Sequence, residues 1–217
     1  MKNKKIVAII PIKTNSKRVK NKNFKKINNI PLYEFLLKKI KSCNFDEIYV
    51  DSDSNKIKSY CKKNNINFIK RLSKLATDNA NGNDLLNYHA KLINADIYFQ
   101  LFITAPLLKI STINKCIETL KKNKKIDSIL TAQKIYSWFW FNNKSVNYNP
   151  KILPRSQDAK PLIQETTGLY GIKKKALKKN KCRIGKKPFF HFIDKDEAID
   201  LDNKEDFDYL KYYVNKN

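Results

Sequence analysis

The sequence predicts an α/β fold, a Rossmann-like three-layer sandwich with a mainly parallel central sheet. Three observations support this prediction. A continuous, β-branched apolar run from Lys5 to Pro11 is typical of a strand buried on both faces. Strand-like and helix-like segments then alternate, which implies crossover connections between parallel strands. The length of 217 residues suits a single α/β domain over residues 1–217.

The predicted elements follow one another in a consistent order. Apolar residues from Leu32 onward recur at helical spacing, and Pro31 stands where the first turn of a helix tolerates proline. Further strands are expected at residues 47–51, 66–70, 97–103, 127–132, 168–172 and 189–193. Further helices are expected at about residues 55–64, 84–93, 110–122 and 203–214. The alternation breaks between residues 136 and 164, where we expect an excursion from the core.

Charge and composition narrow the function classes. The net charge of +25 favours a polyanionic partner such as a nucleotide, an acidic sugar or a nucleic acid. The alternative for many of the lysines is that they lie on a solvated surface and bind no partner. A hydrophobic fraction of 41% is too high for a disordered chain. No apolar run is long enough for a membrane span or a secretory signal. The four cysteines have no spacing that suits zinc or a disulfide framework, so we expect a cytoplasmic protein with no membrane partner.

The loop after the first strand is the first candidate site, because ligands bind beyond the carboxyl ends of strands in open α/β sheets. Seven of the fourteen residues from 13 to 26 are basic, and Asn15, Ser16, Asn21 and Asn23 lie among them. Cations and hydrogen-bond donors beside a helix suit a triphosphate, whereas the alternatives are a solvated loop or a nucleic-acid contact. The loop has no glycine, which argues against dinucleotide-binding and P-loop motifs.

Five segments, in the same order, resemble one enzyme family. They are IIPIKTNSKRVKNKNFKKINNIPL in the first strand and loop, RLSKLATDNANGND from Arg71, QLFITAPL from Gln100, RSQDAKPLIQETTGLYGIK from Arg155 and EAIDLDNKEDF from Glu197. Together they resemble the CMP-sialic acid synthetase family of cytidylyltransferases, which includes the enzymes for pseudaminic and legionaminic acids. The resemblance covers most of the chain.

The resemblance implies a CTP site. Lys22 and Asn23 match the pair that holds the CTP phosphates, and Lys22 would also stabilise the departing pyrophosphate. Lys13 stands where the family usually has arginine, and so keeps the charge without the bidentate fork. Leu72 replaces the usual proline after Arg71. The residues expected to bind the nucleotide are Lys13, Asn15, Ser16, Lys17, Lys22, Asn23, Arg71, Asp78, Asn81 and Gly82.

Asp200 and Asp202 form the candidate metal site. If this segment is extended, its period of two puts both carboxylates on one face, where they suit Mg²⁺. The alternative is a capping box in which Asp202 and Glu205 begin the last helix. The family's paired-aspartate motif implies the metal role, and Lys22, Asp200 and Asp202 are therefore the predicted catalytic residues.

The resemblance also implies an acidic acceptor sugar and a partner subunit. Family counterparts of Gln100, Thr104, Arg155, Gln157 and Gly168 lie around the acceptor sugar. Arg155 is the first candidate for a carboxylate fork, and a surface arginine is its alternative. The excursion crosses to a second copy in this family, which implies a homodimer. The aromatic residues 138–141 suit either that interface or a buried core.

The expected activity is transfer of CMP from CTP to the anomeric hydroxyl of an acidic 2-keto-3-deoxy sugar, with release of pyrophosphate. Mg²⁺ would serve as cofactor, so a separate protein base is not required. His89 and His191 are expected to be structural residues. The alternatives are a uridylyl- or guanylyltransferase acting on a sugar 1-phosphate and a nucleic-acid-binding protein. No nucleic-acid motif supports the latter, so no nucleic-acid partner is expected.

Overall fold

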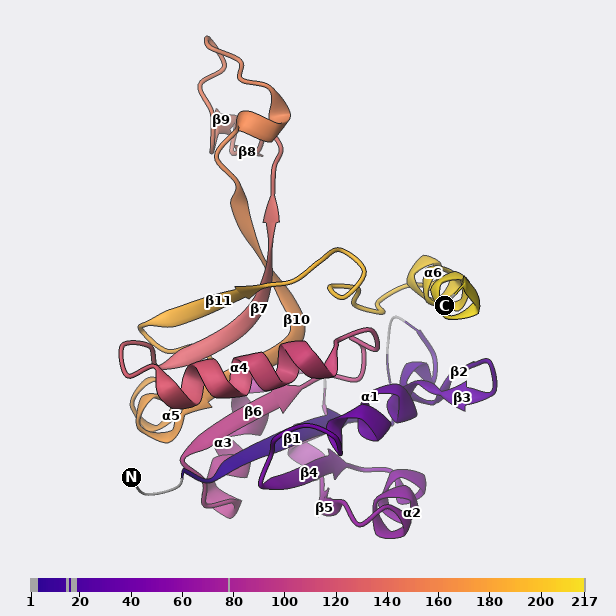
Figure 1. Cartoon of the computed structure of the whole chain (residues 1–217). Coiled ribbons are helices and arrows are strands. Elements are labelled where there is room, and N and C mark those ends of the chain that lie inside the picture. The colour runs from indigo at the N-terminus through magenta and orange to yellow at the C-terminus, as the bar shows by residue number, and fades with distance from the viewer. Residues whose placement is uncertain (1–3, 15, 17–18, 78, 217) are drawn as a thin grey trace.

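The central layer is a mixed sheet of seven strands. The computed structural model describes residues 4–14, 16, 19–77 and 79–216, and its strand order is β11-β7-β10-β6-β1-β4-β5 (Figure 1). The strands are β1 (Ile6–Ile12), β4 (Glu47–Ser52), β5 (Asn67–Lys70), β6 (Ile97–Leu101), β7 (Ser128–Ile135), β10 (Leu162–Lys173) and β11 (Pro188–Phe192). Only β10 runs antiparallel to its neighbours in this sheet of the described chain. The predicted mainly parallel α/β fold is confirmed.

Helices cover both faces of this sheet, which makes three layers. One face carries α1 (Leu32–Ile40), α2 (Asn55–Lys63) and α4 (Ile110–Lys122), and the other carries α3 (Gly82–Leu92) and α5 (Lys174–Asn180). The last helix, α6 (Lys204–Lys216), packs its Phe207 and Leu210 against Leu32 at the start of α1. Short elements complete the described chain: η1 (Lys22–Phe24), β2 (Lys26–Ile27), β3 (Ile30–Pro31), η2 (Ser73–Leu75), β8 (Trp140–Phe141), β9 (Lys144–Ser145) and η3 (Ser156–Asp158).

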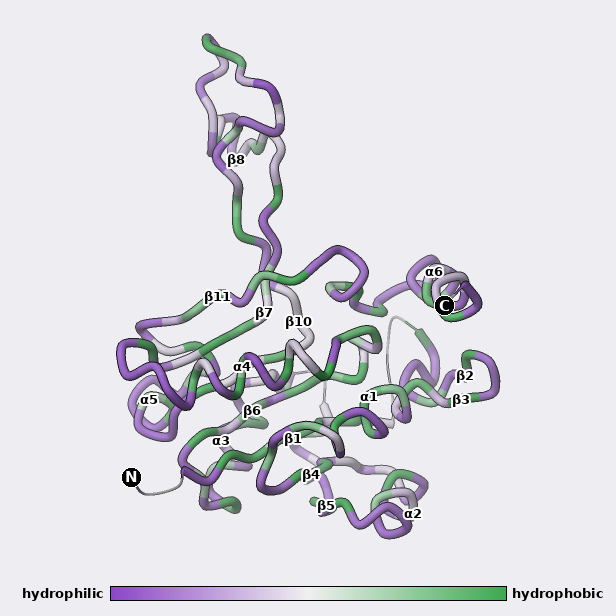
Figure 2. The backbone as a smooth tube through the Cα atoms, in the orientation of Figure 1, coloured by the Kyte–Doolittle hydropathy of each residue, from purple (hydrophilic) through white to green (hydrophobic). Residues whose placement is uncertain are grey.

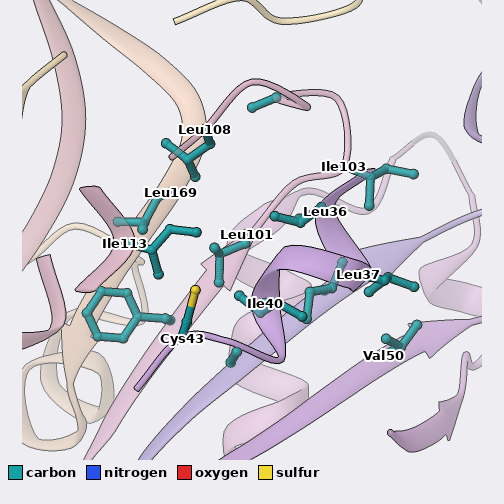
Figure 3. Close-up of a cluster of buried hydrophobic side chains, with 14 of the residues drawn as sticks. Leu36, Leu37, Ile40, Cys43, Val50, Leu101, Ile103, Leu108, Ile113 and Leu169 are labelled. Carbon is teal, nitrogen blue, oxygen red and sulfur yellow. The ribbon is translucent and has the colours of Figure 1, made fainter. Parts of the chain in front are cut away.

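Strand β1 is buried on both faces, as its continuous apolar sequence predicts. Ile6, Ala8 and Ile10 pack into the core under α1 and α4, whereas Val7 and Ile9 pack under α3 and α5. Figure 3 shows the larger core, where α1 side chains meet those of β6 and of the loop after it. Burial of these side chains on both faces fixes the position of β1 within the sheet. The loop that follows β1 is therefore also fixed in position.

Asparagine makes the tight turns of this glycine-poor chain. Among the described residues no glycine has a positive φ, whereas six asparagines do. One of them, Asn21 with φ 55°, immediately precedes η1 and turns the chain into Lys22. Asparagine tolerates this left-handed conformation better than other side chains. Part of the asparagine enrichment therefore has a backbone function, and Asn21 helps to set the direction of Lys22.

The predicted excursion is confirmed as an arm formed by residues 136–161. Strands β7 and β10 extend beyond the sheet and lead into the outer part of the arm, which contains the β8–β9 hairpin (Figure 1). The side chain of Asn147 fastens the arm, because it accepts from the Phe139 amide at 2.9 Å and donates to the Lys160 carbonyl at 2.7 Å. Phe141 is 71% exposed and Ile152 is 74% exposed. The alternative of a buried core for residues 138–141 is wrong, because none of these four residues is buried.

The sequence missed some elements and boundaries. Helix α5 was not predicted, because its lysine-rich sequence KKALKKN has too few apolar residues to show helical spacing. The strand expected at 168–172 is the inner part of β10, which begins at Leu162. None of the helices in the described part of the chain is long and apolar enough to cross a membrane (Figure 2).

Candidate nucleotide-binding site

A cavity of about 450 Å³ opens at the carboxyl ends of β1 and β6. Its described lining holds three basic side chains, Lys13, Lys22 and Arg71, and no acidic one. The remaining described lining residues are Pro11, Ser16, Asn23, Leu75, Thr77, Ala80, Asn81, Gly82, Leu85, Phe102, Ile103 and Thr104. A positively charged cavity beyond the carboxyl ends of parallel strands suits an anionic ligand such as a triphosphate.

The opening loop contributes to this cavity as the sequence predicted. Lys13, Ser16, Lys22 and Asn23 all line it. The Asn23 side chain donates from Nδ2 to the Lys13 carbonyl at 2.7 Å, so it also holds the loop against the end of β1. Asn15 and Lys17, two other predicted nucleotide-binding residues, lie outside the described residues.

Lys22 connects this loop to the C-terminal aspartate segment. Its side chain is nearly buried, and its Nζ donates to the Leu201 carbonyl at 2.7 Å and to Asp202 Oδ1 at 3.0 Å. Leu201 is fully buried, and its amide donates to the Thr104 carbonyl at 2.8 Å. Thr104 lines the cavity. The structure therefore brings Lys22, Asp202 and the residues beside the cavity together, although they lie far apart in sequence.

The Asp200 carboxylate has an environment that suits a cation. Asp200 Oδ1 is buried and has no hydrogen-bond partner within the described chain. Magnesium prefers carboxylate oxygens and needs only one or two from the protein, because waters and phosphates complete its shell. No three His, Cys, Asp or Glu side chains gather as a metal site among the described residues. The donor set thus fits a Mg²⁺ ion that also depends on a nucleotide.

The predicted capping box lies one residue later than expected. Asn203, not Asp202, caps α6: its Oδ1 accepts from the Asp206 amide at 2.9 Å. Asp206 Oδ2 accepts in return from the Asn203 amide at 2.9 Å. The alternative in which Asp202 pairs with Glu205 as the cap is therefore wrong, and the Asp202 carboxylate interacts with Lys22.

Arg71 is held by a buried network that the sequence analysis missed. Its Nε donates to Asp51 Oδ1, and its Nη2 donates to the Asp51 carbonyl at 3.2 Å. His89 Nε2 lies 2.6 Å from the second oxygen of Asp51. Arg71, Asp51 and His89 are all buried. Asp51 therefore orients the Arg71 guanidinium toward the cavity, and His89 has the structural surroundings expected of it.

The start of α3 forms another wall of the cavity. Asn81 caps this helix, because its Oδ1 accepts from the Asn83 amide at 2.8 Å and the Asp84 amide at 3.3 Å. Gly82 is the first helical residue and lines the cavity beside Asn81. A helix N-terminus adds partial positive charge to this wall. Asp78, the remaining nucleotide-binding prediction, lies outside the described residues.

The predicted acceptor residues lie in three different places. Thr104 lines the cavity, and the fully buried Gln100 lies beside it and donates to the Gly82 carbonyl at 3.0 Å. Arg155 and Gln157 are exposed on the arm, where Arg155 Nε pairs with Asp158 at 2.7 Å. A β-carbon on Gly168 would lie only 3.0 Å from the β-carbon of Ala105, so close packing explains the presence of glycine at this position. The roles of all five residues toward a sugar stay predictions.

Arg183 is the most informative residue that sequence reasoning missed. It lies in the loop between α5 and β11, and its guanidinium carbon is 3.6 Å from the centroid of the Tyr170 ring. Tyr170 donates its hydroxyl to Glu165, which also pairs with Arg183 at 3.4 Å. One signal was present in the sequence: arginine is rare in this lysine-rich chain, occurring only at Arg18, Arg71, Arg155 and Arg183.

Comparison with known proteins identifies the family. The family model described as "Cytidylyltransferase" matches residues 7–216. The chain belongs to the cytidylyltransferase family. It is therefore a CTP-dependent nucleotidyltransferase.

Two curated relatives resemble this cytidylyltransferase. Over 79% of the chain it is 28% identical to a Helicobacter pylori protein named pseudaminic acid cytidylyltransferase and UDP-2,4-diacetamido-2,4,6-trideoxy-beta-L-altropyranose hydrolase. The match spans only 35% of that longer protein. Over 96% of the chain it is 26% identical to post-translational flagellin modification protein B of Campylobacter coli, covering 94% of that protein.

A solved structure confirms the fold of this cytidylyltransferase. The structure of CMP:2-keto-3-deoxy-manno-octonic acid synthetase complexed with CTP matches with a TM-score of 0.74 and 14% identity. The match covers 98% of this chain and 99% of that one. At this identity the likeness is one of fold.

The buried network gives a stability prediction. Asp51→Asn leaves the Arg71 guanidinium buried without its countercharge, so we expect the free energy of unfolding to fall by about 3–5 kcal/mol. Urea denaturation of the variant measures this loss. Glu47→Gln is the matched control on the same strand, because the Lys5–Glu47 pair is partly exposed and should contribute less than about 1 kcal/mol. Equal losses in both variants would contradict a special role for Asp51.

Proposed function

We propose that this enzyme transfers CMP from CTP to the anomeric hydroxyl of an acidic 2-keto-3-deoxy sugar of the nonulosonic acid type, with release of pyrophosphate. The contact of Lys22 with Leu201 and Asp202 is the observation that carries this proposal. It joins a basic cavity wall to a pair of carboxylates. Triphosphate chemistry needs both, because the phosphates need cations and a bridging metal needs carboxylate oxygens.

The names of the relatives support an acidic acceptor. The Helicobacter pylori relative is named for pseudaminic acid, and the structural match is named for 2-keto-3-deoxy-manno-octonic acid. Both sugars are acids. An acidic acceptor also suits a chain with a net charge of +25, since the site then binds two anions in succession.

The reaction proposed is a single in-line displacement. The anomeric hydroxyl of the sugar releases its proton to solvent water, and its oxygen forms a bond to the α-phosphorus of CTP. The bond from that phosphorus to the bridging oxygen breaks, and pyrophosphate leaves with the bonding electrons. Lys13 and Lys22 would bind the phosphates, and Lys22 would stabilise charge on the departing group. Arg71, oriented by Asp51, would bind the nucleoside part of CTP.

Asp200 and Asp202 would hold a magnesium ion. Bound Mg²⁺ supplies charge neutralisation and lowers the pKa of a coordinated hydroxyl. Neither histidine of the chain lines the cavity: His89 is fully buried on Asp51, and His191 lies in β11, where burial lowers its pKa. Neither is therefore needed as a general base in this proposal.

The arm supports a proposed homodimer. Its exposed apolar side chains include Trp140, Phe141, Ile152 and Leu153, and a concentration of such residues on a protruding segment is typical of a protein interface. Contact with a second copy would also provide a route by which Arg155 and Gln157 reach an acceptor in the partner's site. The proposed cytoplasmic location is supported by the four cysteines, none of which forms a disulfide.

Product analysis tests the proposed function. Incubation with each nucleoside triphosphate and a panel of sialic, pseudaminic, legionaminic and shorter 2-keto-3-deoxy acids should release pyrophosphate only with CTP and an acid. Mass spectrometry should then detect a CMP-linked sugar. Release of pyrophosphate with UTP or GTP and a sugar 1-phosphate would instead support the alternative sugar nucleotidyltransferase.

Removal of the Lys22 side chain should lower kcat/KM for CTP more than removal of a remote lysine side chain. Lys22→Ala removes the cation that faces the phosphates and frees the Leu201–Asp202 segment, so kcat/KM for CTP should fall by about 100-fold or more. Steady-state kinetics measures this fall. Lys121→Ala on α4 is the control and should stay within about twofold of the parent enzyme. Equal effects at both positions would mean that the loop contributes only general positive charge.

Asp202 should be required for turnover and for the response to metal. Asp202→Asn keeps the shape of the side chain but removes its charge, so kcat should fall by about 100-fold and half-maximal activity should need more Mg²⁺. Asp208→Asn, in an exposed pair with Lys211 on α6, is the control. Near-normal turnover of a folded Asp202→Asn enzyme would remove this residue from the mechanism.

A further inference from the structure

Arg183 is held rigidly beside the cavity, although it comes from a loop that the sequence analysis did not associate with the site. Its amide donates to Asn83 Oδ1 at 2.8 Å, which fixes the backbone to the first turn of α3. Its guanidinium stacks on Tyr170 and lies 5.8 Å from the centroid of Phe102, a lining residue of the cavity. Stacking on an aromatic ring orients a guanidinium without using its hydrogen-bond donors.

Glu165 and Tyr170 complete the support for Arg183. Burial raises the pKa of the Tyr170 hydroxyl, and the hydrogen bond to Glu165 raises it further, so the phenol remains a donor. Asp200 is close enough to add to this effect. The cluster of Arg183, Tyr170 and Glu165 therefore lies near Asp200, the proposed metal ligand, as well as beside the cavity.

The Arg183 guanidinium has more N–H donors than there are hydrogen-bond acceptors around it in the described chain. Glu165 is the only residue of the described chain that accepts a hydrogen bond from the guanidinium, at 3.4 Å. A guanidinium carries five N–H donors in a fixed fork, so Arg183 retains capacity for a second carboxylate. It is also only partly exposed, which makes a bound anion less screened by solvent than one on an exposed lysine.

Gln100 supplies an unused acceptor next to this fork. Its side chain is fully buried, and Oε1 has no hydrogen-bond partner within the described chain. A β-carbon on Gly82 would lie 2.7 Å from Arg183 Nη1 and 3.2 Å from Gln100 Oε1. Both atoms therefore lie around the same point beside Gly82, which lines the cavity, and any side chain at position 82 would contact both of them. Buried polar atoms without partners are rare, and a ligand is one explanation for them.

We propose that Arg183 and Gln100 form the subsite that binds the carboxylate of the acceptor sugar and an adjacent hydroxyl. Arg183 donates to the carboxylate, and Gln100 Oε1 accepts from the hydroxyl. This inference rests on the proposed function and names the specificity residue of the same site. Arg183 takes the role expected of Arg155 within one subunit, since Arg155 is exposed on the arm and paired with Asp158. Lys13, Lys22 and Arg71 remain for the nucleotide, so the two anions bind to separate cations.

Kinetics with Arg183→Gln tests the subsite. The acceptor is the acidic sugar that the parent enzyme uses best, compared with its carboxamide at saturating CTP. The variant should raise KM for the acid by about 10- to 100-fold, because a charged hydrogen-bonded pair is lost. KM for CTP should stay within about twofold, and the preference for the acid over the amide should nearly disappear. Lys186→Gln, an exposed cation of the same loop, is the matched control and should change none of these values.

The remaining outcomes separate this inference from the proposed function. A folded Arg183→Gln enzyme with an unchanged KM for the acid and an unchanged preference over the amide overturns the subsite but leaves the transfer reaction standing. A parent enzyme that makes no CMP-linked product from any acid of the panel overturns both. If Arg183→Gln does not fold, Arg183→Lys decides, because a single ammonium cannot replace the fork. A folded Arg183→Lys enzyme with parental KM for the acid would overturn the subsite.

Discussion

The ammonium of Lys22 is the interaction on which the arrangement of the site depends. It bonds to the carbonyl of Leu201 and the carboxylate of Asp202, and it thereby ties the loop after the first strand to the segment before the last helix. The desolvation cost of a nearly buried cation is offset by these two oxygen partners. Apolar packing supports the same junction, because Leu201 and Phe207 lie in one buried cluster with Ile27 of the opening segment.

The sheet itself was readable from the sequence because its strands are buried on both faces. Residues such as Val7 and Ile9 point to one layer while Ala8 and Ile10 point to the other, and this requires continuous apolar runs. The positions of Lys22, Asn23 and Arg71 beside the cavity followed from the resemblance and from the rule that parallel strands end at one edge. Helix α5 escaped detection because lysines occupy most of its positions.

The parts of the site that escaped detection depend on contacts between distant segments. Asp51 and His89 are unremarkable in sequence, and only folding brings them into one network with Arg71. The same is true of Arg183, which meets Tyr170 and Glu165 through the path of the loop after α5. Periodicity reports which face of an element is buried, but it carries no information about which polar side chains will face one another. The capping residue of α6 was misplaced by one position for a related reason, since Asp206 and Glu205 are both able to serve as the acidic partner.

The attachment of residues 200–202 through Lys22 and Thr104 has a consequence for biosynthesis. The strands of the sheet, the described lining of the cavity and the arm all lie before residue 194, whereas both aspartates and both partners of Lys22 lie after it. Acquisition of the proposed metal ligands would come last, after the segment that follows β11 has left the ribosome and closed over Lys22. A chain that ends before residue 200 would lack the carbonyl and the carboxylate that bind Lys22, so its opening loop would not be attached at this point.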